Sequence, residues 1–282
     1  MSTSKTPAIT AVIIARNEAQ MLPNCLQTLK WCQEVLVIDN GSTDKTAIQA
    51  EKFGAEIITI NYDSFAKLRN EALKRVKTPW LIYIDADERV SPALAREILV
   101  TIETQKTESQ LAALAFNRTN IFYGHPMLAG GWQEDVVPRV FKTTALKFWT
   151  GMVHETPHFE GDQLLLQQPL IHLTHRSTAD GLLKTATWTH REAQLLYESN
   201  LPPVTLLTLL RKTLAEIWRR AIVKKGYRDG QVGWIEALIQ GMNKMLIYIQ
   251  VWELQQKPSL NQQYDQFDKQ LITDWQNYPD LL

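Results

Sequence analysis

The first hundred residues alternate between short apolar runs rich in β-branched residues and longer stretches in which apolar residues recur at helical spacing. Such alternation is typical of a parallel β-sheet whose strands are connected by crossover helices. We therefore expect an α/β fold with a mostly parallel sheet flanked by helices. The pattern predicts strands over residues 9–15, 35–39, 56–60 and 80–84, and helices over residues 19–30, 44–53, 64–76 and 92–104.

The regular alternation ends near Leu111, and glycine, proline, histidine and tryptophan are frequent from there to residue 176. We interpret this stretch as part of a ligand site rather than as further scaffold. Helical periodicity then returns, with long helices predicted over residues 203–225 and 231–255. The predicted organisation is an α/β domain over residues 1–176 and a helical C-terminal extension over residues 177–282.

The C-terminal region carries a basic amphipathic pattern. Residues 211–228 contain seven basic residues and a single acidic one, Glu216, and leucine, isoleucine and tryptophan residues recur at helical spacing beside them. A basic helix with an apolar face suits an anionic membrane surface. The same pattern fits a helix packed on its own domain or on a second subunit, and the sequence leaves these alternatives open.

The net charge, the cysteines and the lengths of the apolar runs limit the kinds of partner and the cellular location that we expect. Thirty basic residues balance thirty acidic ones, so the charge gives no reason to expect a nucleic acid as partner. Cys25 and Cys32 match neither a CxxC metal site nor a disulfide framework, and they fit a reducing compartment. The apolar run over residues 9–15 stops at Arg16 without a cleavage site, and no run approaches the roughly 18 residues of a membrane-spanning helix. We therefore expect a cytoplasmic protein, with or without peripheral contact to a membrane.

Polar residues cluster directly after three of the predicted strands. Because ligands bind beyond the carboxyl ends of the strands in an open parallel sheet, we expect these clusters to meet at one edge. The clusters are Arg16-Asn17-Glu18, Asp39-Asn40-Gly41-Ser42-Thr43-Asp44 and Asp85-Ala86-Asp87-Glu88.

Asp85 and Asp87 are the leading candidates for binding chemistry. Two carboxylates one residue apart at a strand end can reach a single hard cation and leave coordination positions for phosphate oxygens. A solvated acidic loop is one alternative. The nucleophile and acid pair of a haloacid-dehalogenase-like phosphatase is another, although that pair belongs on the first core strand and Asp85 follows the fourth. Asp39 suits a hydrogen bond from a ribose or base, and equally a turn or helix cap.

Several familiar motifs do not occur in this sequence. It has no G-x-G-x-x-G after the first strand and no G-x-x-x-x-G-K-[ST] phosphate loop, which argues against hydride transfer and P-loop ATP hydrolysis. It has no G-x-S-x-G nucleophile elbow either, which argues against an α/β-hydrolase.

Four motifs, in order and at ordinary spacing, resemble the family 2 glycosyltransferases of the GT-A fold. They are Val12-Ile13-Ile14-Ala15-Arg16-Asn17-Glu18, Val37-Ile38-Asp39-Asn40-Gly41-Ser42-Thr43-Asp44-Lys45-Thr46, Leu68-Arg69-Asn70 and Ile84-Asp85-Ala86-Asp87-Glu88. Later segments are similar to the lipopolysaccharide core β-glucosyltransferase subgroup. These are Gly131-Trp132-Gln133-Glu134-Asp135, Arg139-Val140-Phe141, Val153-His154-Glu155, Pro169-Leu170-Ile171-His172 and Gly226-Tyr227-Arg228-Asp229-Gly230.

The resemblance implies an inverting transfer of a sugar from a UDP-sugar, or another nucleotide sugar, to a glycolipid or glycan acceptor, assisted by Mg²⁺ or Mn²⁺. It implies metal contacts from Asp85 and, more firmly, Asp87. His154 is a candidate for a further contact to the metal or the diphosphate, and equally for a structural histidine. A module that only binds a nucleotide sugar is the remaining alternative. The donor-binding residues implied are Ala15, Asn17, Glu18, Asp39, Lys67, Arg69, Asp85 and Ala86.

The acceptor hydroxyl needs a group that takes its proton. An inverting transfer is a single displacement, so this base faces the sugar from the side opposite the diphosphate and comes from a separate segment. We predict that Asp135 is the base, in a loop whose Trp132 is placed to stack on a sugar ring; Glu134 and Glu155 compete for the role. The subgroup commonly has Tyr-Pro-Asp where this chain has Gln133-Glu134-Asp135, which keeps the carboxylate but leaves acceptor specificity open.

Overall fold

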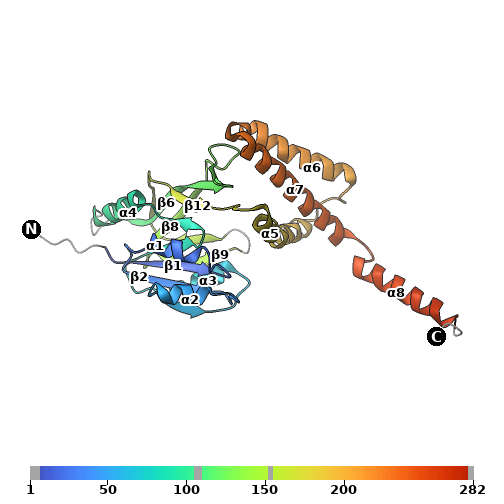
Figure 1. Cartoon of the computed structure of the whole chain (residues 1–282), viewed down its shortest axis with the longest axis horizontal. Coiled ribbons are helices and arrows are strands. Elements are labelled where there is room, and N and C mark those ends of the chain that lie inside the picture. The colour runs from blue at the N-terminus through green and yellow to red at the C-terminus, as the bar shows by residue number, and fades with distance from the viewer. Residues whose placement is uncertain (1–6, 105–109, 152–154, 279–282) are drawn as a thin grey trace, which may run out of the picture. The chain divides into compact units, whose positions relative to one another are not determined.

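The computed structural model describes residues 7–104, 110–151 and 155–278 of the chain. The chain divides into two compact units, Met1–Ser177 and Thr178–Leu282. The first contains the β-sheet and the second is helical (Figure 1).

The first unit begins with alternating strands and helices and continues as a series of strands. The four strands predicted in the first hundred residues are present, with ends within one residue of the prediction, and the last predicted helix has the predicted bounds. The strands are β1 (Ile9–Ala15), β2 (Glu34–Asp39), β3 (Glu56–Thr59), β4 (Trp80–Asp85), β5 (Glu88–Arg89), β6 (Leu111–Phe122), β7 (His125–Pro126), β8 (Val136–Lys142), β9 (Leu146–Thr150), β10 (Thr156–Phe159), β11 (Asp162–Leu165) and β12 (Leu170–Leu173). The helices are α1 (Leu22–Gln27), α2 (Thr46–Lys52), α3 (Phe65–Leu73) and α4 (Pro92–Thr104).

Helix α1 is shorter than the helix predicted over residues 19–30. A proline, Pro23, lies in its first turn, where a missing N–H leaves no bond unmade. The chain before it is held in a loop, because the backbone N–H of Ala19 donates to the Asp44 carboxylate (3.1 Å). The apolar periodicity therefore extends beyond the helix into residues that are fixed by a neighbouring loop.

The direction of the strands decides which loops meet. The sheet order is β3-β2-β1-β4-β8-β6-β12-β5, with β7 and β11 also paired to β6. Strands β1 to β4 are parallel, and β8 is antiparallel to both β4 and β6. Since β12 is parallel to β6, the carboxyl ends of β1, β2, β4, β6 and β12 lie at the same edge as the amino end of β8. The predicted α/β architecture, a mostly parallel sheet with helices and a helical C-terminal part, is confirmed.

The interpretation of residues 111–176 as part of a ligand site rather than scaffold is corrected by the structure, in which strands β6 and β8 of this stretch belong to the sheet. Both strands are central to the sheet, and residues Leu111–Phe116 of β6 are buried. The pairing of β6 with β8 skips one residue of β8, because Leu114 pairs with Val140 and Ala115 with Pro138. The skipped residue is Arg139, so β8 carries a bulge, and the bulge together with Pro138 hides the strand period from sequence analysis.

Side chains of β1 enter two hydrophobic cores, one on each face of the sheet. Ile9, Ala11 and Ile13 belong to the core that includes side chains of α1 and α4. Val12 and Ile14 belong to the core that includes side chains of α3 and β9. Burial on both faces explains why this strand is a continuous apolar run rather than an alternating one.

The second unit is built around one long helix. Its small core combines residues of α5, the α5–α6 connection and α7: Ala193, Val204, Ile247, Tyr248 and Val251. Among the described residues, none of the helices has both the length and the apolarity to cross a bilayer. The elements are α5 (Thr178–Glu198), α6 (Leu206–Trp218), the π-helical turn η1 (Arg219–Val223), the 3₁₀ turn η2 (Gly226–Asp229), α7 (Gly230–Gln255) and α8 (Leu260–Gln276).

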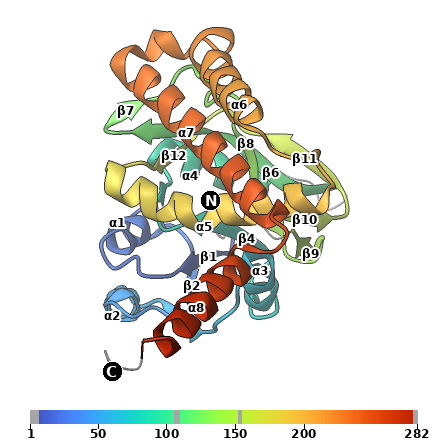
Figure 2. The same cartoon turned by 90° about the vertical axis from the view of Figure 1, so that its right-hand side faces the viewer.

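Helices α6 and α7 lie side by side (Figures 1 and 2). Two glycines of α7 permit the close approach of the preceding chain. A Cβ on Gly241 would lie 2.4 Å from Cγ1 of Ile217 in α6, and a Cβ on Gly233 would lie 1.9 Å from the carbonyl oxygen of Gly226. The close packing of α6, η2 and α7 therefore requires glycine at both positions.

Helix α7 buries an acidic side chain, Glu236, which is 1% exposed. Its Oε1 accepts a hydrogen bond from Nε2 of Gln240 (2.7 Å). Burial raises the pKa of the Glu236 carboxyl from 4.5 to about 7, and the bond from Gln240 and the charge of Arg220 oppose the shift. The stability of this unit consequently depends on pH in the neutral range.

The substitution Glu236→Gln is expected to flatten this pH dependence. Because the folded-state pKa of about 7 exceeds the unfolded value, stability is greatest below pH 4.5 and falls as the pH rises through this window. The loss amounts to roughly 3 kcal/mol. Urea unfolding at acidic and mildly alkaline pH measures it, with Glu253→Gln, at an exposed position of the same helix, as control. Equal pH slopes for wild type and Glu236→Gln would contradict the prediction.

Candidate active site

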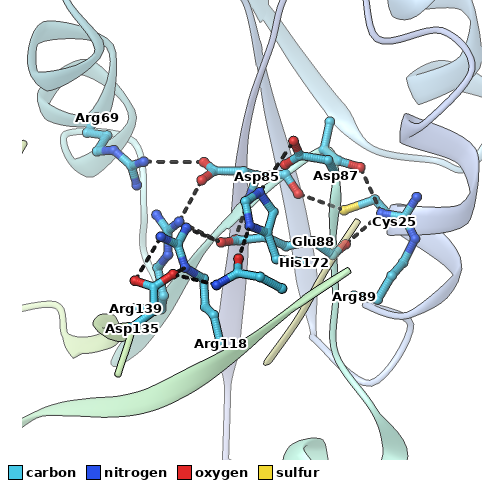
Figure 3. A network of polar contacts seen from close by, with 12 residues as sticks. Cys25, Arg69, Asp85, Asp87, Glu88, Arg89, Arg118, Asp135, Arg139 and His172 are labelled. Carbon is cyan, nitrogen blue, oxygen red and sulfur yellow. Dashed lines mark hydrogen bonds and ion pairs between the residues drawn. The ribbon is translucent and has the colours of Figure 1, made fainter. Parts of the chain in front are cut away.

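Residues from β4, β6 and β8 meet at one edge of the sheet (Figure 3). Asp85 ends β4 and Asp87 follows it, while Arg118 lies near the carboxyl end of β6. Asp135 directly precedes β8, and because β8 is antiparallel to β4 and β6, its amino end reaches the same edge. The reversed strand therefore brings a carboxylate from a distant segment next to the carboxylates of β4.

The loops after β1 and β2 are tied together beside this edge. The backbone N–H of Asn17 donates to Ser42 Oγ (2.9 Å), and the Asn17 side-chain oxygen accepts from the backbone N–H of Thr43 (2.8 Å). The backbone N–H of Glu18 donates to Oγ1 of Thr46 (2.8 Å). Ala15 and Asp39 pair in register at the two strand ends. The candidate donor residues Ala15, Asn17, Glu18 and Asp39 thus lie in adjoining segments, where Ala15 and Asp39 are buried.

Asp39 is largely buried, and part of its hydrogen-bonding capacity serves the local turn. Its Oδ1 accepts from the backbone N–H of Ser42 (3.1 Å), which is the turn role that the sequence also allowed. Only 4% of the residue is exposed, at the end of β2.

Asp85 is held by two arginines. Arg69 Nη2 lies 3.3 Å from Oδ1, and Arg139 Nη2 lies 2.5 Å from Oδ2. Burial of the carboxyl raises its pKa, but Arg139 and Arg69 outweigh this effect and hold the pKa of Asp85 below its usual value. The carboxylate is therefore ionised, with a guanidinium on each oxygen.

Glu88 is fully buried and shared by two arginines. Its Oε1 accepts from Arg139 Nη2 (2.7 Å) and Arg118 Nη1 (3.4 Å), and its Oε2 accepts from the backbone N–H of Asp85 (2.9 Å). Burial raises the pKa of the Glu88 carboxyl, and the charge of Arg139 opposes this shift. Glu88 joins β4, β6 and β8 beneath the edge of the sheet.

Arg89 fixes the loop that carries Ala86 and Asp87. It donates to the carbonyl oxygens of Ala86 (2.7 Å), Glu88 (2.6 Å) and Met21 (3.0 Å). Ala86 is 4% exposed in this loop. The turn between the two aspartates is therefore anchored to the start of α1.

Asp135 is bound on both oxygens. Arg118 donates from Nε to Oδ2 (2.8 Å) and from Nη2 to Oδ1 (3.0 Å), a bidentate pair, and Asn120 Nδ2 donates to Oδ2 (3.0 Å). Burial raises the pKa of Asp135, but the bonds from Arg118 and Asn120 outweigh it and leave the pKa lowered. The geometry orients this carboxylate and keeps it ionised.

A chain of polar contacts connects Asp135 to Asp87. Because the Asn120 amide nitrogen also faces the carbonyl oxygen of Trp132 (3.3 Å), its oxygen faces His172 Nδ1 at 2.7 Å. His172 therefore donates from Nδ1, and its Nε2 lies 3.5 Å from Asp87 Oδ2. At metal sites a ligating histidine is commonly fixed in this way, by a hydrogen bond that its other ring nitrogen donates.

The remaining candidates are spread more widely. Arg69 is buried beneath the edge, with its guanidinium over the rings of Tyr83 (5.2 Å) and Trp149 (4.8 Å). Glu155 is an electrostatic neighbour of Arg69. Lys67, two residues from Arg69 on α3, is exposed and borders a groove with Phe148 instead. His154 lies outside the described residues.

Trp132 and Glu134 sit near Asp135 in different settings. The Trp132 ring packs against Phe122, with ring centroids 4.9 Å apart, and Phe122 in turn contacts His175 (4.4 Å). Trp132 thus takes part in an aromatic cluster beneath the loop. Glu134 is exposed.

Arg118, Asn120 and His172 were not predicted as site residues. The signal for the first two was present, because Arg118 and Asn120 alternate after the apolar run of β6 just as Asp85 and Asp87 follow β4. His172 stood within a quoted motif, but only the folded sheet brings β12 beside β6 and so places it near Asp87.

Among the described residues, no group of three or more histidine, cysteine, aspartate or glutamate side chains is placed to hold a metal ion. Asp87 and His172 face one another as a pair, whereas both oxygens of Asp85 are bound by arginines. A cation here would need further ligands from a phosphate or water.

Residues 10–158 match the family model described as glycosyl transferase family 2, which is more than half of the chain. The chain therefore belongs to glycosyltransferase family 2, and the protein is a glycosyltransferase enzyme with the GT-A type of fold. This family assignment argues against the two alternatives, a haloacid-dehalogenase-like phosphatase and a module that only binds a nucleotide sugar.

Curated relatives agree with this assignment. An uncharacterized glycosyltransferase of Rickettsia bellii is 35% identical over 113 residues, which are 40% of this chain and 38% of that protein. The lipopolysaccharide core biosynthesis glycosyltransferase LpsC of Rhizobium meliloti is 36% identical over 96 residues, 32% of this chain and 35% of that protein. These matches span well under two thirds of either relative. A Rickettsia conorii glycosyltransferase, also uncharacterized, is 25% identical over 87% of this chain and 90% of its own length.

Solved structures show more distant likeness. Mannosyl-3-phosphoglycerate synthase from Rubrobacter xylanophilus aligns with a TM-score of 0.47 and 17% identity, over 71% of this chain and 77% of that one. TarS of S. aureus (residues 1–349) aligns with a TM-score of 0.46 and 13% identity, over 84% and 81%. The family assignment rests on the sequence match and not on these alignments.

The substitution Glu88→Gln is expected to lower the free energy of unfolding by roughly 3 kcal/mol, because it replaces an oxygen that accepts from buried donors of Arg139, Arg118 or the backbone of Asp85 with an N–H donor. Urea unfolding measures the loss. Glu51→Gln, at an exposed position on α2, is the control and should change stability by less than about 0.5 kcal/mol. Similar values for the two variants would show that Glu88 does not anchor the arginines.

Proposed function

We propose that this enzyme transfers a sugar, with inversion, from a UDP-sugar to a hydroxyl group of a glycolipid or glycan acceptor, with Mg²⁺ or Mn²⁺ as cofactor. The observation that carries the proposal is the placement of two carboxylates in different surroundings at one edge of the sheet. Asp87 faces His172, and Asp135 is oriented by Arg118 and Asn120. The two ends of the reaction, the leaving diphosphate and the entering hydroxyl, need such different groups.

The joined loops after β1 and β2 support a site for the nucleoside. In an open parallel sheet this is where nucleotides bind. Ala15, Asn17 and Glu18 would line the pocket. Asp39 has one oxygen engaged with Ser42 and would accept from the uracil or ribose with the other.

Asp87 and His172 would hold a divalent cation, which would help to bind the diphosphate of the donor. His172 donates from Nδ1 to Asn120, which leaves Nε2 as the ligand atom. Such a cation supplies Lewis-acid stabilisation of the leaving diphosphate. Asp85 suits a different role, since it holds Arg69 and Arg139 in place and orders the turn that carries Asp87. We therefore assign the metal to Asp87 in preference to Asp85.

Asp135 is the proposed general base. The acceptor oxygen bonds to the anomeric carbon as the bond from that carbon to the diphosphate breaks, and the hydroxyl proton passes to the carboxylate. Arg118 lowers the pKa of Asp135, so the base is ionised throughout the neutral range, at the expense of some basicity. Orientation of a charged base compensates for weak basicity because the reacting atoms are held in place.

The name of one relative supports the class of acceptor that we propose. LpsC of Rhizobium meliloti is named as a lipopolysaccharide core biosynthesis glycosyltransferase and is 36% identical over 32% of this chain. A glycolipid acceptor is consistent with that likeness. We assign donor binding and catalysis to residues 1–176 and membrane association to the helical region over residues 177–282.

The substitution Asp87→Ala is expected to abolish metal-dependent transfer, by at least about 100-fold, because the cation loses its protein carboxylate. The measurement is release of the nucleoside diphosphate from a panel of nucleotide sugars, with Mg²⁺, with Mn²⁺ and with a chelator. Asp268→Asn, at an exposed position of α8, is the control. Wild-type rates for Asp87→Ala would refute the metal assignment.

The substitution Asp135→Asn is expected to lower turnover by roughly 10²–10⁴-fold while the KM for the donor stays nearly constant, since it keeps the size of the side chain, removes the basic carboxylate and leaves the loops after β1 and β2 unchanged. Steady-state kinetics with a lipid-linked acceptor measure both constants. Glu155→Gln is the comparison. If Asp135→Asn turned over normally and Glu155→Gln did not, Glu155 would be the base.

A further inference from the structure

The second unit exposes an apolar stripe that its own packing does not use. On α6 the side chains of Leu207, Leu210, Leu214 and Trp218 are 74, 51, 63 and 62% exposed. Their spacing of three and four residues places them on one side of the helix. Single exposed leucines are common, but a contiguous apolar stripe marks an interaction surface.

The stripe continues onto α7. Leu214, Trp218, Ile222 and Trp234 line a shallow groove of about 500 Å³ between α6, η1 and α7. Leu238, one turn further along α7 from Trp234, is 55% exposed. We call the exposed side chains of this area the α6 face, which consists of Leu207, Leu210, Leu214, Trp218, Trp234 and Leu238.

The surroundings of the α6 face are basic. Residues 206–228 contain seven basic residues and one acidic residue, Glu216, a net charge of +6. Glu216 pairs with Arg219 (2.5 Å) and Arg220 (3.0 Å) of the same helical segment. Arg211, beside the stripe, is exposed. Lys225, directly before the η2 turn, and Arg228, within it, are exposed as well. The apolar face is thus bordered by cations.

We propose that the α6 face docks on an anionic lipid bilayer. Leucines enter the boundary between headgroups and acyl chains, tryptophans occupy the interface, and basic residues contact the acidic headgroups. Each cation near an anionic leaflet adds to the affinity, so a net charge of +6 around one apolar stripe complements such a surface. This proposal concerns the second unit alone and is independent of the donor, metal and base assigned to the first.

A second copy of the chain suits this face less well. In a two-fold dimer the same patch from both subunits would meet, which sets one cluster of +6 against another. Helix α8 has its own exposed apolar residues, Phe267 and Leu271 among them, but its three aspartates and one lysine give a charge of only −2. An α8 helix from another copy would leave most of the cations without counter-charge.

Flotation of the full chain with vesicles tests the proposal, in the absence of any nucleotide sugar. Vesicles of phosphatidylcholine and phosphatidylglycerol in equal parts should carry the protein to the top of the gradient, and vesicles of phosphatidylcholine alone should not. High salt should reverse the binding. The double variant Leu210→Glu/Leu214→Glu should bind at least about tenfold more weakly, and Lys225→Gln/Arg228→Gln about tenfold more weakly.

The matched control is Phe267→Glu/Leu271→Glu, which makes the same change on the exposed apolar side of α8 and should leave vesicle binding unaltered. Circular dichroism verifies that the helices of each variant persist. Equal flotation with both kinds of vesicle, or unchanged flotation of the α6 variant, would overturn the proposal. So would light scattering that shows a dimer in solution which Leu210→Glu/Leu214→Glu converts to a monomer. If the α8 variant also converted this dimer to a monomer, helix α8 of a second copy would be the partner that covers the α6 face.

Discussion

The edge of the sheet depends on one buried ion-pair network centred on Arg139. This arginine is the extra residue in the bulge of β8, and it bonds to Asp85 of β4 and Glu88 of β5. A bulge redirects a side chain that a regular strand would point elsewhere. The cost of burying these charges is offset only because each has a partner. The loop of Asp87 is therefore held by a residue of a different strand.

The same network gives the carboxylates of the edge different surroundings. Asp85 and Glu88 are each bound by two arginines, whereas Asp87 faces a histidine and Asp135 is bound by one arginine and an amide. The difference between these carboxylates arises from the residues that contact them and not from their own residue type. The two aspartates of the Asp-x-Asp sequence therefore have different partners, since Asp85 is bound by Arg69 and Arg139 and Asp87 faces His172.

The second unit buries a glutamate while apolar side chains of α6 remain exposed. Its core encloses a glutamate, and α7 uses Gly233 and Gly241 to bring the preceding helical segments close. Once α6 packs through its inner side, Leu210, Leu214 and Trp218 remain on the outside. An amphipathic pattern alone does not distinguish a helix that buries its apolar side from one that exposes it. Only the folded unit shows which residues of α6 are already used.

The sequence by itself determined the alternation of the first hundred residues, the loops that follow β1, β2 and β4, and the family, because these depend on local periodicity and contiguous motifs. It did not determine that β6 and β8 belong to the centre of the sheet, since a bulge and Pro138 break the period of β8. Nor did it determine the partners of Asp135. Arg118 and His172 lie 17 and 37 residues from Asp135 along the chain, and they meet it, directly or through Asn120, only because β8 runs antiparallel beside β6 while β12 runs parallel to it. Contacts of this kind are set by strand order and direction, which no local pattern encodes.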